Sequence, residues 1–201
     1  MSREEAVAPP REPTRIQRER RDRILAGGLT VFAEAGFAGA TLDGIAQAAG
    51  LSKPNLLYYF SGKEAIYRAL LDRLLTTWLD PLRALDPDGV PLDEVLGYVR
   101  RKLHLARDYP DESRLFAGEI LHGAPQMGTA LSGDLRRLVD DRAAVIAGWM
   151  ADGRLARSDP HHLIFAIWAL TQHYADFEVQ VRAVLGPDRD PWTEAEAELQ
   201  T

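Results

Sequence analysis

Apolar residues recur at helical spacing along most of the chain and divide it into a series of amphipathic helices. The first helix is predicted from about Arg15, and its apolar positions stop at Gly36, a residue type that commonly follows a helix end. Thr41 stands where an N-cap belongs, before a second helix that Gly50 ends. Ser52 caps a third, short helix. Two short helices joined by a tight glycine-containing turn, with a longer helix before them, are typical of a helix-turn-helix.

The rest of the chain predicts further helices and no strands. A long helix is expected from residue 61 or 62 to about Pro81, and a strongly apolar helix of 18 residues, LIFAIWALTQHYADFEVQ, follows the cap formed by Asp159 and Pro160. The other helices are expected from Pro91 to before Pro110, around Leu115 up to Gly123, from Leu131 to Gly153, and from Thr193 onward. With no alternating β pattern, the expected fold class is all-α with about nine helices.

This pattern divides the chain into three expected parts. Residues 1–14 hold a run rich in proline and alternating charge, and we expect a disordered leader there. Residues 15–62 form the helix-turn-helix domain, whose third helix can enter a major groove about 12 Å wide. Residues 63–201 form a second helical domain for ligand binding and dimerisation.

Composition narrows the class of protein. The 201 residues include no cysteine, which excludes a disulfide framework and thiolate metal sites and favours a reducing compartment. No apolar run approaches the roughly 18 residues of a membrane span, and the first residues lack the apolar stretch of a secretory signal. We therefore expect a cytoplasmic protein with no membrane contact.

Charge is distributed unevenly along the chain. The net charge is −6, yet residues 1–64 hold nine Lys and Arg against eight Asp and Glu, whereas residues 65–201 hold 15 against 22. Within the first part, five arginines crowd together: Arg15, Arg18, Arg20, Arg21 and Arg23. Such a basic cluster suits DNA phosphates or a minor groove, and the alternative interpretation is an ordinary solvated helix face.

The helix-turn-helix region carries a specific signature. Residues 32–67 read F-A-E-x-G-F-x-x-A-T-L-x-x-I-A-x-x-A-G-x-S-K-x-x-L-L-Y-Y-F-x-x-K-E-A-I-Y. This stretch resembles the N-terminal domain of TetR-family transcriptional regulators. The resemblance implies a homodimer that binds double-stranded operator DNA and responds to a small-molecule effector.

The same resemblance implies DNA contacts from the third helix and its flanks. Lys53 offers a cation to guanine and Asn55 an amide to adenine, while Pro54 offers only apolar contact. The other residues implied, mainly through phosphates and sugars, are Arg20, Thr41, Ser52, Tyr58, Tyr59 and Lys63. Two alternatives stay open: Ser52 acts only as a helix cap, and one of the two tyrosines packs with Phe60 against the first helix.

The second half of the chain is similar to a branch of this family that controls pyrimidine use. The similarity lies in R-D-Y-P-x-x-S-R-L-F at residues 107–116 and in D-P-x-H-L-I-F-x-I-W-A-x-T-Q-H-Y-A-D-F at residues 159–177. It implies that uracil, or the related thymine, binds in the C-terminal domain and weakens operator binding.

Helical spacing makes a pyrimidine effector chemically reasonable. At about 100° per residue, Phe165, Trp168, Gln172 and Asp176 fall near one face of their helix. A Gln amide can answer the N–H and C=O pair of a pyrimidine, and an indole can stack on its ring. The remaining expected effector contacts are His173 and Tyr174 on adjoining faces, with Trp78, Phe116 and Glu119 as opposite walls. The alternative is a packed core tryptophan with a hydrogen-bonded glutamine, and a partner subunit against His173 and Tyr174.

Motifs for catalysis are not found. His161 and His162 cannot present both rings on one helix face, and no nucleophile, zinc-protease or nucleotide-binding motif occurs in the sequence. We expect a protein that is not an enzyme and that needs no metal or cofactor.

The expected function is a repressor whose dimer is held by a four-helix interface from the last two helices and is released from DNA by a pyrimidine. The alternatives are the same regulator with another effector, a DNA-binding protein without an effector, and a small-molecule binder that has lost DNA binding.

Overall fold

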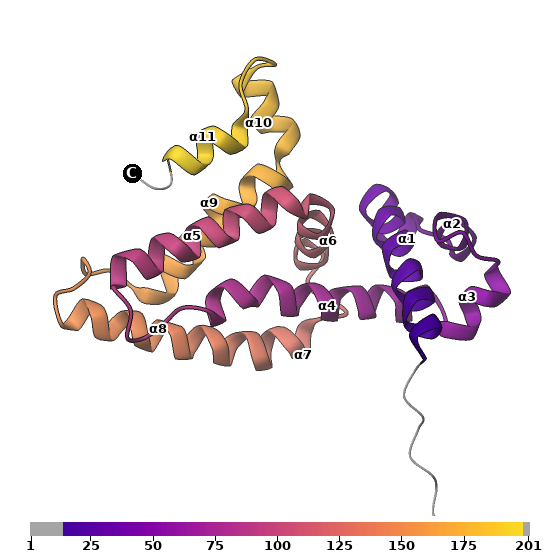
Figure 1. Ribbon diagram of the computed structural model, residues 1–201, viewed down its shortest axis with the longest axis horizontal. Helices are drawn as coiled ribbons and strands as arrows, with labels where there is room; N and C mark the ends of the chain where they lie inside the picture. Colours follow the sequence, from indigo (N-terminus) through magenta and orange to yellow (C-terminus); the bar gives the residue numbers. More distant parts are fainter. Residues whose placement is uncertain (1–13, 199–201) are drawn as a thin grey trace, which may run out of the picture.

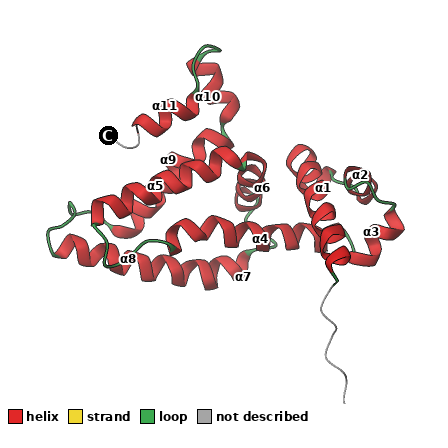
Figure 2. Cartoon of the chain, in the orientation of Figure 1, coloured by secondary structure: helices red, strands yellow, loops and turns green. Residues whose placement is uncertain are grey.

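The computed structural model describes residues 14–198, and every regular element in that range is helical (Figures 1 and 2). In chain order the elements are α1 (Arg15–Gly39), α2 (Leu42–Ala48), α3 (Lys53–Tyr59), α4 (Lys63–Arg83), α5 (Pro91–Asp108), α6 (Pro110–Leu121), α7 (Gly128–Ala130), the π-helical segment η1 (Leu131–Leu135), α8 (Arg136–Ala151), α9 (Pro160–Asp176), α10 (Glu178–Leu185) and α11 (Pro191–Glu198). The predicted all-α fold class is confirmed. Residues 1–13 of the predicted leader lie outside the described range. Within residues 14–198, no helix has the length and apolar character needed to cross a membrane.

Helices α1, α2 and α3 form the helix-turn-helix unit. Their apolar faces meet in a core of buried side chains that includes Ile24, Phe32, Ile45 and Leu56. Gly27 lets α1 and α2 approach closely, because a Cβ atom there would lie 2.7 Å from a backbone nitrogen of α2's C-terminal end. The unit is therefore held by tight packing as well as by its core.

Helix α4 connects the helix-turn-helix unit to the rest of the chain (Figure 1). In its first half, Ile66 and Leu70 belong to the same core as α1. At its far end, Leu82 belongs to a second core, which contains Tyr98 and Ile146 and is built mainly from α5, α8 and α9. Helix α4 thus contributes side chains to both cores.

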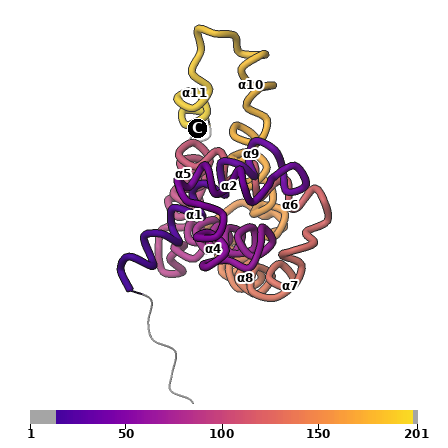
Figure 3. The backbone as a smooth tube through the Cα atoms, turned by 90° about the vertical axis from the view of Figure 1, so that its right-hand side faces the viewer, coloured from indigo at the N-terminus to yellow at the C-terminus, as the bar shows by residue number. Residues whose placement is uncertain are grey.

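The C-terminal body surrounds the far half of α4. Helices α5 and α9 pack closely on one another, α8 packs on α9, and α6 lies between this body and α1 (Figure 1). Helices α10 and α11 stand away from the main bundle, as Figures 1 and 3 show. Trp149 ties α8 to the loop before α5 through a bond of 3.1 Å from its Nε1 to the Pro87 carbonyl.

One predicted helix end coincides with a break and another is corrected. Gly36, where the first helix was predicted to stop, leaves helical geometry at φ 66° and ψ 171°, and a short second helical stretch then carries α1 to Gly39. Pro81 does not halt α4, which runs on to Arg83. A proline in the last turn removes only one backbone hydrogen bond, so the helix can continue past it.

Of two predicted long helices, one is continuous and one is divided in the structure. The helix expected from Leu131 to Gly153 begins with the π-helical segment η1, which runs without a break into α8 and ends at Ala151. The apolar helix after Pro160 ends at Asp176, and α10 begins beyond Phe177, whose φ of −118° and ψ of 29° break the helix. The predicted helix continuity was therefore wrong only at Phe177.

Candidate nucleic-acid interface and effector site

The turn between α2 and α3 is fixed by local hydrogen bonds. Thr41 Oγ1 accepts a bond of 3.1 Å from the Gly44 N–H and so caps α2 as predicted. At the other end of α2, Arg23 Nη2 donates to the carbonyls of Ala49 at 2.8 Å and Gly50 at 3.2 Å. Gly50 has a φ of 63°, which suits glycine and turns the chain toward α3. These contacts present α3 in one orientation.

Helix α3 carries five of the residues that were predicted to reach DNA and exposes four of them. Lys53, Pro54 and Asn55 are all exposed in its first turn, and 73 % of Tyr58 is exposed. Lys53 Nζ lies 2.9 Å from Asp43 Oδ2 on α2, an exposed pair that a phosphate can replace at small cost. Ser52 occupies the N-cap position of α3 but its side chain makes no capping hydrogen bond. Its hydroxyl is therefore not committed to the helix.

The two adjacent tyrosines of α3 have different surroundings. Tyr59 is half-buried against the helix-turn-helix core, and its ring meets the ring of the exposed Tyr58 edge to face, with centroids 5.0 Å apart. Phe60, which follows them, is buried in the same core. This arrangement agrees with the alternative in which one tyrosine packs with Phe60.

Lys63 makes contacts other than the predicted one. Its Nζ donates to the carbonyls of Phe37 at 2.9 Å and Ala40 at 3.0 Å, and it lies 4.7 Å from the centroid of the Phe37 ring. These carbonyls lie at the C-terminal end of α1, where a cation satisfies groups that have no helical partner. In the structure this ammonium closes the corner between α1 and α2, and its contact with a DNA phosphate stays a prediction.

The predicted arginine cluster is divided among several roles. Arg15 pairs with Glu19 at 2.7 Å, and the guanidinium of Arg21 lies 4.2 Å from the centroid of the Phe60 ring. Arg23 is committed to the α2 end. Arg18 and Arg20 are exposed on α1. The cluster therefore combines structural contacts with exposed charge.

A buried polar cluster lies inside the C-terminal body. It consists of Lys102 on α5 and Ser113 on α6, which are both buried, and of Asp176 on α9, which is half-buried. Ser113 Oγ donates to Asp176 Oδ1 at 2.5 Å, while Lys102 Nζ lies 5.3 Å from the centroid of the Trp78 ring. Helix α9 thus meets the consecutive helices α5 and α6 and brings a cation, a hydroxyl and a carboxylate together.

Burial shifts the proton equilibria of this cluster. Only 2 % of Lys102 is exposed, and desolvation lowers the pKa of its ammonium to about 7, against the opposing charge of Asp176. Burial raises the pKa of the Asp176 carboxyl, and the Ser113 hydrogen bond and the Lys102 charge oppose that rise. An ammonium and a carboxylate kept away from water are costly to the fold, which is typical of a site that binds something.

Of the two predicted effector tryptophans, Trp78 adjoins this cluster, and Trp168 contacts Tyr98, one turn before Lys102 on α5. Trp78 contacts Lys102, and its Nε1 is buried with no hydrogen-bond partner among the described residues. Trp168 Nε1 donates to Tyr98 Oη at 2.6 Å. Gln172 is half-buried one turn after Trp168, on the same flank of α9 as Asp176.

The other predicted effector residues lie elsewhere. Glu119 is buried, but it accepts hydrogen bonds from Tyr67 Oη and the Gln126 N–H, and Phe116 packs against the helix-turn-helix core. His173 and Tyr174 line a cavity of about 730 Å³ beside α10 and α11. The structure therefore does not bring the seven predicted residues together at one place.

Neither Lys102 nor Ser113 is among the site residues predicted from the sequence. A signal for Lys102 was available, because it stands four residues after Tyr98 and four before Ala106 on the apolar face of α5. A lysine at such a position is either paired or functional.

Comparison with known proteins finds relatives for both parts of the chain. Residues 24–70 match the family described as "Bacterial regulatory proteins, tetR family", and residues 71–201 match "YcdC-like protein, C-terminal region". The HTH-type transcriptional regulator RutR of Escherichia coli (strain K12) is 53 % identical over 163 residues, which are 81 % of this chain and 77 % of RutR.

Solved structures share the fold. The SCO4942 protein of Streptomyces coelicolor superposes with a TM-score of 0.68 at 30 % identity, over 90 % of this chain and 94 % of that one. AibR, solved in complex with isovaleryl coenzyme A and operator DNA, has a TM-score of 0.68 at 16 % identity, over 90 % and 96 % of the two chains. The second likeness shows the fold alone.

Proposed function

Because the chain belongs to the TetR family of bacterial regulatory proteins, and is thus a DNA-binding transcriptional regulator, we propose that it is a repressor released from its operator by uracil or thymine. The observation that carries the effector part is the buried cluster of Lys102, Ser113 and Asp176 beside Trp78. Such a regulator acts on DNA in the bacterial cytoplasm, and its target genes would serve pyrimidine and nitrogen metabolism.

The DNA-reading surface is proposed to be the exposed face of α3. Asn55 and Lys53 would read base edges, and Pro54 would contact a thymine methyl. The proposed phosphate and sugar contacts are Arg20, Thr41, Ser52, Tyr58 and Tyr59. The Thr41 oxygen already accepts a bond from Gly44, so its hydroxyl hydrogen remains available to a phosphate oxygen.

The protein is proposed to act as a homodimer joined through α8 and α9. Helix α9 exposes an apolar stripe that includes Phe165 and Leu170, which are 45 % and 53 % exposed. Helix α8 exposes small residues that would let a partner helix approach: Ala144, Ala147, Gly148 and Ala151. Two helices from each subunit then give a four-helix interface and place two α3 helices on a palindromic operator.

A pyrimidine fits the donors and acceptors of the buried cluster. Uracil presents two carbonyl oxygens and two N–H groups on a flat ring. The unpartnered Trp78 Nε1 and the Lys102 ammonium can donate to carbonyls, while Asp176 can accept from a ring N–H. Gln172 can answer an adjacent N–H and C=O pair, and Trp168 supplies an aromatic face.

Helix α4 gives the effector a route to the DNA-binding unit. It begins at Lys63, which closes the corner of α1 and α2, and it carries Trp78 fifteen residues later. If the ligand and the operator prefer different positions of α4, each weakens the binding of the other by the same free energy, typically about 1–3 kcal/mol.

Calorimetric titration with uracil and thymine, with adenine as a control, tests this proposal. We expect saturable binding at one site per subunit in the wild type and loss of binding in Lys102→Met and Trp168→Ala. Leu92→Ala, at an exposed position of α5, is the matched control and should bind normally. Binding of adenine alone would identify another effector class, and normal uracil binding by both cluster variants would contradict the site.

A further inference from the structure

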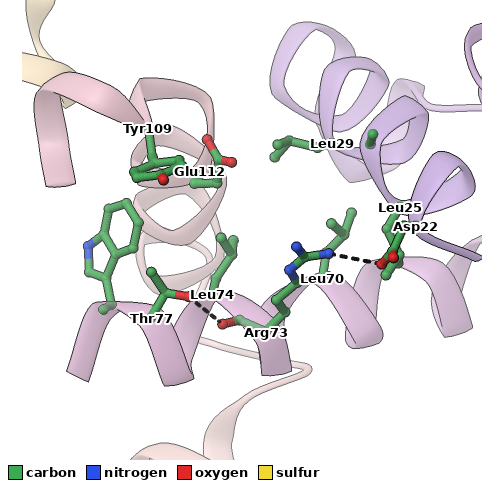
Figure 4. Close-up of a pocket in the computed structure, with 11 residues that line it drawn as sticks. Asp22, Leu25, Leu29, Leu70, Arg73, Leu74, Thr77, Tyr109 and Glu112 are labelled. Carbon is green, nitrogen blue, oxygen red and sulfur yellow. Dashed lines mark hydrogen bonds and ion pairs between the residues drawn. The ribbon is translucent and has the colours of Figure 1, made fainter. Parts of the chain in front are cut away.

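A separate cavity of about 400 Å³ lies where α1, α4 and α6 meet (Figure 4). Its volume is within the range of small-molecule sites. None of Lys102, Ser113 or Asp176 lines it, and Trp78 is the residue that borders both places. The cavity therefore lies between the helix-turn-helix unit and the C-terminal body, outside the proposed pyrimidine site.

The walls of this junction cavity are mainly apolar. Leu25 and Leu29 come from α1, and Leu70 and Leu74 come from α4. Figure 4 shows Leu29 and Glu112 pointing toward one another across the space above Leu74. An occupant must therefore have an apolar body that contacts both the DNA-binding unit and the body of the protein.

Charged groups stand at two edges of the cavity. Arg73 on α4 reaches toward α1, and its Nη1 lies 3.2 Å from Asp22 Oδ1 (Figure 4). Glu112 on α6 is half-buried and has no side-chain ion pair among the described residues. Because Asp22 already neutralises Arg73, the lining keeps one uncompensated negative charge.

Aromatic rings accompany this charge. Tyr109 stands on the same side as Glu112 in Figure 4, and Trp78 completes the wall. Ring faces attract cations as well as apolar groups. Burial, together with the nearby charge of Asp111, raises the pKa of the Glu112 carboxyl, while its backbone hydrogen bond and the charge of Arg73 oppose this rise.

We propose that the junction cavity is a second small-molecule site, which takes an organic cation with an apolar body and places the cationic group beside Glu112. The leucines of α1 and α4 hold the apolar body, and Glu112 with the Tyr109 ring holds the charge. Since the walls belong to α1 and α6, an occupant fixes the distance between these helices and changes operator affinity. This effect does not require the pyrimidine site.

Calorimetric titration of the full-length protein with benzyltriethylammonium chloride tests the site. The wild type should bind one cation per subunit, whereas 4-tert-butylbenzoate, an anion of similar size, should not bind. Glu112→Gln should weaken cation binding at least tenfold. Asp111→Asn is the matched control, because it removes an acid from the same helix turn that does not line the cavity, and it should change binding less than twofold.

A second variant tests the cavity itself. Ala26 lies at an exposed position of α1 and lines the space, so Ala26→Leu should narrow the cavity and weaken cation binding while circular dichroism stays unchanged. Lys102→Met should bind the cation like the wild type even though it has lost uracil binding. Absence of saturable cation binding by the wild type, equal binding of the anion, or unchanged affinity in Glu112→Gln would overturn the proposal.

Discussion

The Tyr67 hydroxyl donates a hydrogen bond of 3.2 Å to Glu119 Oε2 and so joins α4 to α6. The other carboxylate oxygen, Glu119 Oε1, accepts from the Gln126 N–H at 2.6 Å. Both side chains are buried, and the Tyr67 ring packs on Phe32 and Phe37 of α1. Glu119 therefore links the C-terminal body to the helix-turn-helix unit.

Tyr67→Phe should lower the free energy of unfolding by about 1–3 kcal/mol, because it leaves a buried carboxylate oxygen without its donor. For a chain of this size, the melting temperature should fall by about 2–4 °C per kcal/mol. Thermal denaturation followed by circular dichroism measures the change. Tyr58→Phe, at an exposed ring, should leave the melting temperature unaltered, and equal behaviour of the two variants would show that the Glu119 bond contributes nothing.

Lys102 should make stability depend on pH. Burial lowers the pKa of its ammonium from the ordinary value of 10.5, which applies in the unfolded chain, to about 7 in the folded protein. Between these two pH values the unfolded chain binds more protons than the folded protein. The free energy of unfolding therefore rises with pH in this range. Urea denaturation at pH 7 and pH 9 should show this rise in the wild type, and Lys102→Met should flatten it. Lys53→Met, at an exposed lysine, should keep the rise; a rise that persists in Lys102→Met would refute the assignment.

Lys63→Met separates a structural role from a DNA contact. Loss of the bonds to the Phe37 and Ala40 carbonyls should lower the free energy of unfolding by about 2 kcal/mol. The slope of log affinity for DNA against log salt should stay the same, whereas loss of a phosphate contact would reduce it by about one. An unaltered stability with a reduced slope would restore the phosphate contact as the role of Lys63.

Sequence reasoning located the helix-turn-helix because its boundaries depend on local chemistry. Thr41 and Asp159 cap their helices with side-chain bonds to residues two or three positions ahead, so the signal is contained in a few consecutive residues. The break at Phe177 has no such signal, since the apolar pattern continues across it. Glu178 pairs there with Arg114 of α6 at 3.3 Å, and a contact between distant segments is not readable from local spacing.

The effector site was only partly predictable for the same reason. Helical periodicity placed Trp168, Gln172 and Asp176 on one flank of α9, but it could not show that Ser113 binds Asp176 or that Lys102 faces Trp78. Glu119 was expected at an effector, yet its partner Tyr67 is 52 residues away in sequence. Assigning such pairs requires the packing of α4, α5, α6 and α9.

Two substitutions on α3 should affect DNA binding differently. Asn55→Ala should cost about 1–3 kcal/mol on the best operator and relax selectivity at one base pair, because an amide reads a base edge. Tyr58→Phe should weaken binding by a similar factor on every sequence, as expected for a phosphate contact. The best operator is first selected from random DNA, and single-base variants of it are then made. The affinities of both protein variants for this panel distinguish these outcomes. Identical selectivity profiles for Asn55→Ala and the wild type would exclude base reading by Asn55.

The dimer can be tested at Leu170, which is 53 % exposed on the apolar stripe of α9. Leu170→Glu places two like charges in the interface of a symmetric dimer, where burying unpaired carboxylates is costly, so the protein should sediment at about half the wild-type mass. In a dimer, binding of one subunit to its half-site holds the second subunit at a high effective concentration near the other half-site. A monomer lacks this gain, so operator affinity should fall at least about 100-fold. Leu121→Glu, at a leucine of α6 that is 81 % exposed, is the matched control and should remain dimeric. If Leu170→Glu stays dimeric with normal operator affinity, the subunits must join through another surface, and the apolar stripe of α9 must serve a different partner.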